Sequence, residues 1–169
     1  PYNVTRSVAL GLPARRLSVL TDEATHELDL RGIGRILALT SNDEVNALAT
    51  TRFSRVFGRR ETFQLAPSEK QRQGPLPEEL LGRIVGIEGL DYGTLDERAR
   101  QGWRVRSSPA GPSITAATEG GLFLPMARVF EGQLSFVCRN DPVPSQGTVI
   151  GFAAPSVQKD LDRAEESVG

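Results

Sequence analysis

Five polar residues that lie close together in the sequence carry the side chains best suited to bind a small ligand: Thr40, Ser41, Asn42, Asp43 and Asn46. Their hydroxyl and amide groups suit hydrogen bonds to a ribose or a base, and a helix starting beside them would attract negative charge. The sequence therefore predicts a ligand-binding loop. The alternative is that these residues only build the loop, with Asn42 and Asp43 in the turn and Asn46 as its anchor.

The residues on either side of this loop indicate a strand and a helix. Residues 36–39 form a continuous apolar run, Ile-Leu-Ala-Leu, which is typical of a strand covered on both faces. Ser41 and Glu44 have the spacing of a capping box, and apolar residues at helical spacing follow until Gly58, which is placed to end the helix. A central parallel strand followed by this helix would hold the loop where open α/β sheets bind ligands.

Few residues could support catalysis or bind a metal. Asp43 and Glu44 are neighbouring carboxylates, but successive helical residues point about 100° apart, so the pair does not converge on one proton. The single histidine, His26, and the single cysteine, Cys138, exclude the usual zinc sets and a disulfide within the monomer. We expect a buried Cys138 and a solvated His26, with pH sensing as the alternative for His26. The sequence predicts no enzyme activity and no metal site.

The composition is typical of a soluble globular protein. The 169 residues are 38% hydrophobic and 24% charged, and the formal net charge is -1. That balance argues against a nucleic-acid partner. No apolar run approaches the ~20 residues needed to cross a bilayer, and no signal peptide is visible. The sequence starts at Pro1 and its single methionine is Met126, so we expect a fragment of a larger protein.

The pattern of elements predicts an α/β fold, in which an incomplete Rossmann-like parallel sheet with helices precedes a smaller α+β module containing a β-hairpin. The first half alternates helix and strand, which implies right-handed crossovers and parallel pairing. Proline, glycine and polar residues then mark a linker. The predicted divisions are residues 1–67 for the Rossmann-like part, 68–77 for the linker, 78–158 for the α+β module and 159–169 for a charged tail.

Further elements are expected from capping, alternation and turn signals. Trp103 heads an alternating strand and is expected to be a core or interdomain anchor, with ligand stacking as the alternative. The expected elements are a helix ending before Gly11, a strand at 17–20, a helix at 21–28, a strand at 62–66, a helix at 78–81, a helix capped by Thr94 and Glu97 and ending near Gly102, a strand at 103–107, a hairpin of 122–130 and 133–138 around Glu131-Gly132, a strand at 148–153 and a loose helix within 159–166.

One segment carries a resemblance to a known family. Residues 27–46, Glu-Leu-Asp-Leu-Arg-Gly-Ile-Gly-Arg-Ile-Leu-Ala-Leu-Thr-Ser-Asn-Asp-Glu-Val-Asn, resemble the later half of a TrkA-N domain, also called an RCK domain. The version they resemble more closely follows the membrane domain of bacterial NhaP-type sodium or potassium/proton antiporters. The resemblance continues in Val56-Phe-Gly-Arg, Phe63-Gln-Leu-Ala-Pro67, Gly102-Trp-Arg-Val-Arg106 and Asp141-Pro-Val-Pro144.

The sequence departs from that family at its start. A full TrkA-N domain opens with a strand, a G-x-G-x-x-G loop and a second strand ending in an acidic residue, and none of these is found here. Gly32-Ile-Gly34 precedes a strand and is expected to form a tight turn, because a phosphate-binding loop needs its glycines at the start of a helix. The resemblance therefore implies that the pyrophosphate site and the ribose-binding carboxylate are missing.

The resemblance implies a regulatory or assembly region of a monovalent-cation/proton antiporter on the cytoplasmic face of the membrane. Its partner would be the transmembrane domain of the same polypeptide, and the sensed ligand would be an adenine nucleotide or NAD(H), bound at the loop of residues 40–46. Two alternatives remain open. A half-sheet with an unpaired edge predicts a ligand-free dimerisation module, hence a homodimer or a sheet completed by a partner chain. The doubly wound pattern also permits a nicotinamide-dependent oxidoreductase, although a fold does not give a function.

Overall fold

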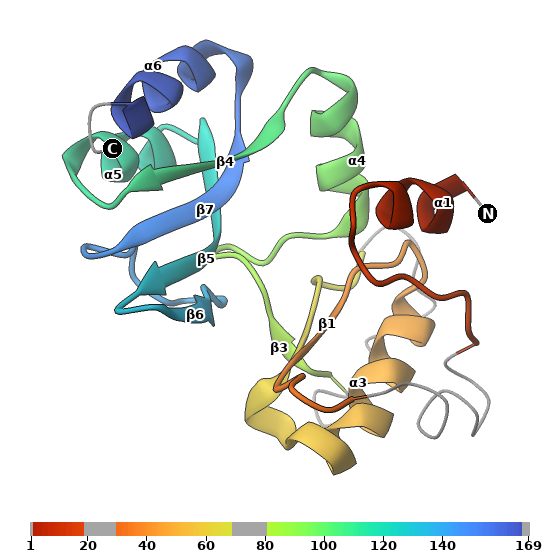
Figure 1. Ribbon diagram of the computed structural model, residues 1–169. Coiled ribbons are helices and arrows are strands. Elements are labelled where there is room, and N and C mark those ends of the chain that lie inside the picture. The colour runs from red at the N-terminus through yellow and green to blue at the C-terminus, as the bar shows by residue number, and fades with distance from the viewer. Residues whose placement is uncertain (1, 19–29, 69–80, 167–169) are drawn as a thin grey trace. The chain divides into compact units, whose positions relative to one another are not determined.

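The computed structural model describes residues 2–18, 30–68 and 81–166 (Figure 1). Contacts divide the chain into two compact units, Pro1–Gly34 and Arg35–Gly169. The first unit contains helix α1 (Tyr2–Ala9), and the chain turns at Gly11, whose φ is 74°. The expected helix before Gly11 is therefore confirmed. Residues 17 and 18 form no strand, while the expected helix at 21–28 and His26 lie outside the described residues.

The second unit begins with a small parallel sheet. Strand β1 (Ile36–Ala38) leads through a loop into helix α3 (Asp43–Phe57), and a 3-10 turn, η1 (Arg59–Glu61), precedes strand β2 (Thr62–Gln64). Strand β3 (Arg83–Ile84) lies on the other side of β2, and both pairings are parallel. The predicted parallel α/β arrangement is confirmed. Among the described strands β2 is the central one and β1 lies at an edge, and Leu39 is 44% exposed, so the expectation that residues 36–39 form a central strand covered on both faces is wrong.

The second sheet of this unit is antiparallel and has the order β4-β7-β5-β6. The predicted hairpin is confirmed, because Glu131 and Gly132 between β5 and β6 have φ values of 50° and 72°, as a two-residue hairpin turn requires. The four strands of this sheet are β4 (Arg104–Pro109), β5 (Phe123–Phe130), β6 (Gln133–Phe136) and β7 (Thr148–Ala153). The helices of the same part of the chain are α4 (Tyr92–Arg100), α5 (Pro112–Glu119) and α6 (Pro155–Glu166).

Three apolar clusters hold the second unit together. Helices α5 and α6 cover one face of the antiparallel sheet, where Ile114 and Leu161 pack against Phe123 (Figure 1). Trp103 is buried and packs against Phe152, with ring centroids 5.9 Å apart, which confirms its role in the core. The third cluster contains one residue from each of three segments and joins the two sheets: Phe63, Val85 and Cys138.

The ends of two helices differ from their predicted caps. The side chain of Asn42, not Ser41, accepts a hydrogen bond from the N–H of Val45 at 2.9 Å. Likewise, Asp91 rather than Thr94 caps α4, accepting from the N–H of Thr94 at 2.6 Å. Both capping-box predictions are wrong, because the side-chain oxygens of Asn42 and Asp91 already accept from the free N–H groups at the starts of these helices. Gly58 ends α3 as predicted, and its N–H donates to the carbonyl of Ser54.

Other boundaries also differ from the sequence-based expectation. The parallel sheet takes its third strand from residues 83–84, beyond the predicted linker at 68–77, and the compact units meet at Gly34 and Arg35 instead of near residue 67. Only residue 68 of that linker and residues 159–166 of the charged tail are described, and the latter belong to α6, which starts earlier, at Pro155. Strand β6 ends at Phe136, and the chain continues to Cys138, which bridges to Val85. Helix α5 was not predicted.

Candidate functional site

The loop that follows β1 lies at the carboxyl end of a parallel strand, and together with the first turn of α3 it contains the five predicted ligand-binding residues. Its inner anchor is Asn46, whose side chain is 1% exposed. The Asn46 Oδ1 accepts from the N–H of Thr40 at 3.0 Å and from its hydroxyl at 2.7 Å, and Nδ2 donates to the carbonyl of Thr40 at 2.9 Å. The amide of Asn46 therefore uses both its oxygen and its nitrogen to hold the loop.

Asn42 and Asp43 also stabilise this loop. The Asn42 side chain caps α3, and the backbone N–H of Asn42 donates to the hydroxyl oxygen of Thr40 at 3.3 Å. Asp43 is 9% exposed, and its Oδ2 accepts from the N–H of Ser68 at 2.8 Å, which ties the start of α3 to the chain that leaves β2. Each side chain keeps some capacity to bind, since the Asn42 amide nitrogen and the Asp43 Oδ1 make no hydrogen bond within the described residues.

Ser41 differs from its neighbours. It is exposed, and its side chain makes no hydrogen bond within the described part of the chain. A ligand at this loop would therefore meet the Ser41 hydroxyl, the Asn42 amide nitrogen and the Asp43 Oδ1, whereas Thr40 and Asn46 support the loop from within. The structure brings the five predicted residues together, and binding of a ligand by them stays a prediction.

A buried polar group in the neighbouring strand β2 was not predicted. Gln64 is fully buried at the end of β2, and its Oε1 accepts from the hydroxyl of Thr50 and from the N–H of Gly82, both at 3.0 Å. Its Nε2 donates to the carbonyl of Leu65 at 3.3 Å. A Cβ at Gly82 would lie 2.8 Å from the Thr50 methyl group, so this close approach requires glycine. The only signal in the sequence was a polar residue within an apolar strand.

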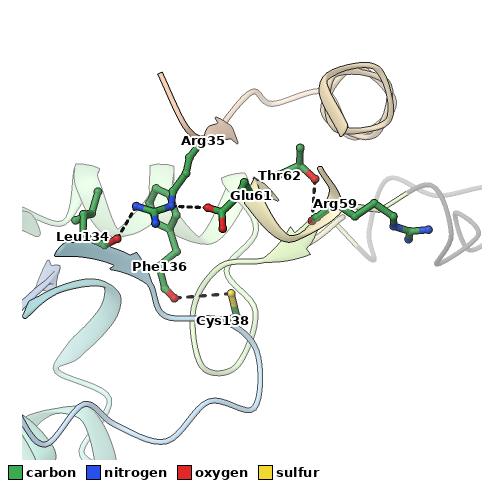
Figure 2. A network of polar contacts seen from close by, with 7 residues as sticks. All are labelled: Arg35, Arg59, Glu61, Thr62, Leu134, Phe136 and Cys138. Carbon is green, nitrogen blue, oxygen red and sulfur yellow. Dashed lines mark hydrogen bonds and ion pairs between the residues drawn. The ribbon is translucent and has the colours of Figure 1, made fainter. Parts of the chain in front are cut away.

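Arg35 links the two sheets of the second unit (Figure 2). Its Nε donates to Glu61 Oε2 at 2.6 Å, and its Nη1 donates to the backbone carbonyl of Leu134 at 2.6 Å. Glu61 ends the 3-10 turn before β2, and Leu134 belongs to β6. One guanidinium thus contacts the residue that precedes β2 of the parallel sheet and the edge strand β6 of the antiparallel sheet. The partners are 26 and 99 residues away in sequence, so no local pattern indicates this link.

Cys138 lies beside this link, and its thiol is within 3.9 Å of the carbonyl of Phe136 (Figure 2). The expected burial of Cys138 is confirmed. Burial raises the pKa of this thiol above its ordinary value of 9.0, with the positive charge of Arg83 lowering it and the negative charge of Asp141 raising it. Asp141 also accepts from the N–H of Cys138 at 2.8 Å. A thiol held protonated is a weak nucleophile, which agrees with a structural role.

The described ranges contain neither a cluster of metal-ligating side chains nor a helix suited to span a membrane. No group of three or more histidine, cysteine, aspartate or glutamate side chains in residues 2–18, 30–68 and 81–166 is arranged to bind a metal ion. Within the same ranges, no helix has the length and apolar character that a membrane span requires.

Comparisons with known proteins gave a structural likeness but no match in sequence. No protein-family model and no curated protein sequence matches the chain. Among solved structures, one described as the crystal structure of the GsuK RCK domain is similar at 13% sequence identity, with a TM-score of 0.30. The alignment covers 90% of this chain and 38% of that one, so this chain spans well under half the length of the protein it is compared with.

Proposed function

We propose that this chain is a regulatory or assembly region of a monovalent-cation/proton antiporter of the NhaP type, with no chemistry of its own. It would work at the cytoplasmic face of the membrane, with the transmembrane domain of the same polypeptide as its partner. The observation that carries the proposal is the unit formed by β1, the polar loop and α3. This unit overlaps the segment that resembles the family at residues 36–46, and its strand β1 pairs in parallel with β2.

The transport part of the proposal is tested in membranes. The gene that encodes this chain is expressed in full in bacteria that lack their own sodium and potassium/proton antiporters, and exchange is measured in everted vesicles with a fluorescent pH probe. We expect Na⁺ or K⁺ to dissipate the proton gradient, and deletion of the region from Arg35 onward to change the rate. Vesicles that show no cation-dependent proton movement would contradict the proposal.

The ligand part concerns the loop after β1. We propose that an adenine nucleotide or NAD(H) binds there, contacted by the Ser41 hydroxyl, the Asn42 amide nitrogen and the positive N-terminal end of α3. Titration calorimetry with ATP, ADP, AMP, NAD⁺ and NADH tests this. We expect Ser41→Ala to weaken binding severalfold, with Ser113→Ala as a control at an exposed serine in another helix. Equal binding by both variants would mean that any nucleotide binds elsewhere. Turnover of a nicotinamide cofactor with candidate substrates would instead support the oxidoreductase alternative.

A second candidate function, dimerisation without a ligand, is favoured by the exposed apolar side chains around this unit. Leu39 and Leu48 are each 44% exposed and Val56 is 49% exposed. Leu48 and Val56 are eight residues apart on α3, so they lie on the same side of the helix. Among the described strands, β1 also forms one edge of its sheet. Light scattering across a hundredfold concentration range tests this: we expect a dimer that Leu48→Glu disrupts, and a wild-type monomer throughout would exclude it.

A further inference from the structure

A groove of about 360 Å³ lies between the parallel and the antiparallel sheet of the second unit. One wall comes from Arg83 at the start of β3, and another from Arg128 in β5 and Ser135 in β6. The remaining side is the chain at residues 141–145, which includes two prolines and a valine. Its volume is within the range of small-molecule sites, roughly 300–1,000 Å³.

The two arginines that line this groove have no ionic partner among the residues that the structure describes. Neither Arg83 nor Arg128 makes a side-chain hydrogen bond or an ion pair within the described ranges. Each guanidinium instead lies over a phenylalanine ring, Arg83 at 5.2 Å from the centroid of Phe63 and Arg128 at 5.7 Å from that of Phe130. A guanidinium that stacks on a ring is oriented yet keeps its N–H groups free to donate. Both side chains are thus prepared to bind an anion.

Two further polar residues, Ser135 and Asp141, line the groove. Ser135 pairs directly with Arg128 across the β5–β6 ladder, so their side chains lie on the same face of the sheet. Asp141 contributes one negative charge, and its Oδ2 is occupied by the N–H of Cys138. With two cations against one carboxylate, the groove carries a net positive charge. The Arg83 charge also reaches the thiol of Cys138 and lowers its pKa, opposing the effects of burial and Asp141.

We propose that this groove binds a phosphate ester, with Arg83 and Arg128 donating to the phosphate oxygens and the rest of the ligand lying against Pro142, Val143 and Pro144. Planar guanidinium groups donate paired hydrogen bonds that match phosphate geometry, and two of them together suit a dianion. Because Arg83 comes from the parallel sheet and Arg128 from the antiparallel one, a bound phosphate would join the two sheets. This site is separate from the loop after β1 and does not depend on the function proposed above.

Titration calorimetry with inorganic phosphate, glycerol 3-phosphate and AMP, at low ionic strength, tests the proposal. We expect a phosphate ester to bind more tightly than inorganic phosphate, because only the ester contacts the apolar wall. Arg83→Gln and Arg128→Gln should each raise the Kd at least tenfold. The matched control is Arg100→Gln, which removes one positive charge from an exposed residue of α4 whose partner is Asp96. A general electrostatic effect would change all three variants equally and would overturn the assignment.

Three additional measurements make the result decisive. Circular dichroism establishes that each variant is folded. If Arg128→Gln is unstable, Arg128→Lys takes its place; this variant keeps the charge without the planar guanidinium and should bind with intermediate affinity. Ser41→Ala should leave binding in the groove unchanged, which distinguishes it from a nucleotide at the loop. The proposal fails if none of the three probes binds at millimolar concentration, if succinate binds as well as the esters, or if the two glutamine variants retain wild-type affinity.

Discussion

Asn46 and Thr40 are joined by three hydrogen bonds, in which one side-chain amide satisfies the N–H, the carbonyl and the hydroxyl of a residue six positions earlier. The contact spans the whole turn from β1 into α3. Since Asn46 is almost completely buried, these bonds are protected from competition with water. The loop is therefore shaped from its inner side, and its outer side, with Ser41, is left for contact with other molecules.

Replacement of Asn46 tests this account of the loop. Asn46→Ala would leave the N–H and the carbonyl of Thr40 without partners, and we expect the free energy of unfolding to fall by about 2 kcal/mol. Urea unfolding followed by circular dichroism measures the change. Ser41→Ala in the same loop is the control, and it should alter stability by no more than about 0.5 kcal/mol, as is usual for an exposed side chain. Similar losses in both variants would contradict the inner anchor.

The pair Arg35 and Glu61 should make only a small contribution to stability. Their side chains are 38% and 39% exposed, and exposed ion pairs contribute about 0.2–1 kcal/mol. A double-mutant cycle with Arg35→Gln and Glu61→Gln should give a coupling energy in that range, and added salt should reduce it. Arg35→Gln alone should cost more than Glu61→Gln, because only the arginine also bonds the carbonyl of Leu134. The reverse order would show that the carbonyl contact is unimportant.

Gly147 should tolerate no side chain. Its φ is 83°, and a Cβ there would lie 2.3 Å from the carbonyl oxygen of Val129, which belongs to the neighbouring strand β5. Both the backbone conformation and the space require glycine, so we expect Gly147→Ala to lower the free energy of unfolding by about 2 kcal/mol or more. Gly111→Ala is the control, because a Cβ at Gly111 meets no atom within 4 Å. Thermal unfolding of the two variants measures the difference.

The thiol of Cys138 predicts how stability depends on pH. Burial raises its pKa in the folded chain above 9.0, so the folded state holds this proton more tightly than the unfolded state. The resulting stabilisation is complete below about pH 9, the unfolded value, and is lost as the pH rises through the folded value. Other groups titrate in this range, so the measurement is the difference between wild type and Cys138→Ala in urea unfolding from pH 8 to 11. A constant difference would contradict the shift.

The charges around Cys138 predict the direction of two further shifts. Asp141→Asn removes a negative charge and should lower the pKa of the thiol, whereas Arg83→Gln removes a positive charge and should raise it. Cys138 is the single cysteine, so the thiolate absorbance that each protein gains over its Cys138→Ala counterpart during a pH titration reports this pKa without a reagent having to reach the buried sulfur. Shifts in the same direction for both variants would show that packing, not charge, dominates the environment of the sulfur.

Local signals predicted much of this fold. The hairpin followed from Glu131-Gly132 between alternating residues, and β7 from an apolar run after a turn-rich segment. The helix caps were placed wrongly, since Thr40, Ser41, Asn42 and Asp43 form a continuous polar run in which several residues could cap. Helix α5 was missed because Ile114 is the only fully buried residue in its eight positions, which gives no apolar period.

The candidate sites were predicted less completely, for a physical reason. The loop after β1 is a contiguous segment, so residue types alone located it. The groove between the sheets depends on Arg83, Arg128 and Asp141, which come from three separate elements, and the link through Arg35 depends on a backbone carbonyl 99 residues away. Such long-range contacts are fixed by the packing of Phe63, Val85 and Cys138, which leaves no periodic pattern in the sequence.

The bond from Arg35 to residue 134 has an evolutionary consequence. Because the acceptor is the main-chain carbonyl of Leu134, the side chain at that position is free to drift without breaking the bridge between the sheets. Glu61, in contrast, accepts through its carboxylate. Homologous sequences should therefore show covariation between positions 35 and 61 and none between 35 and 134, although both partners touch the same guanidinium.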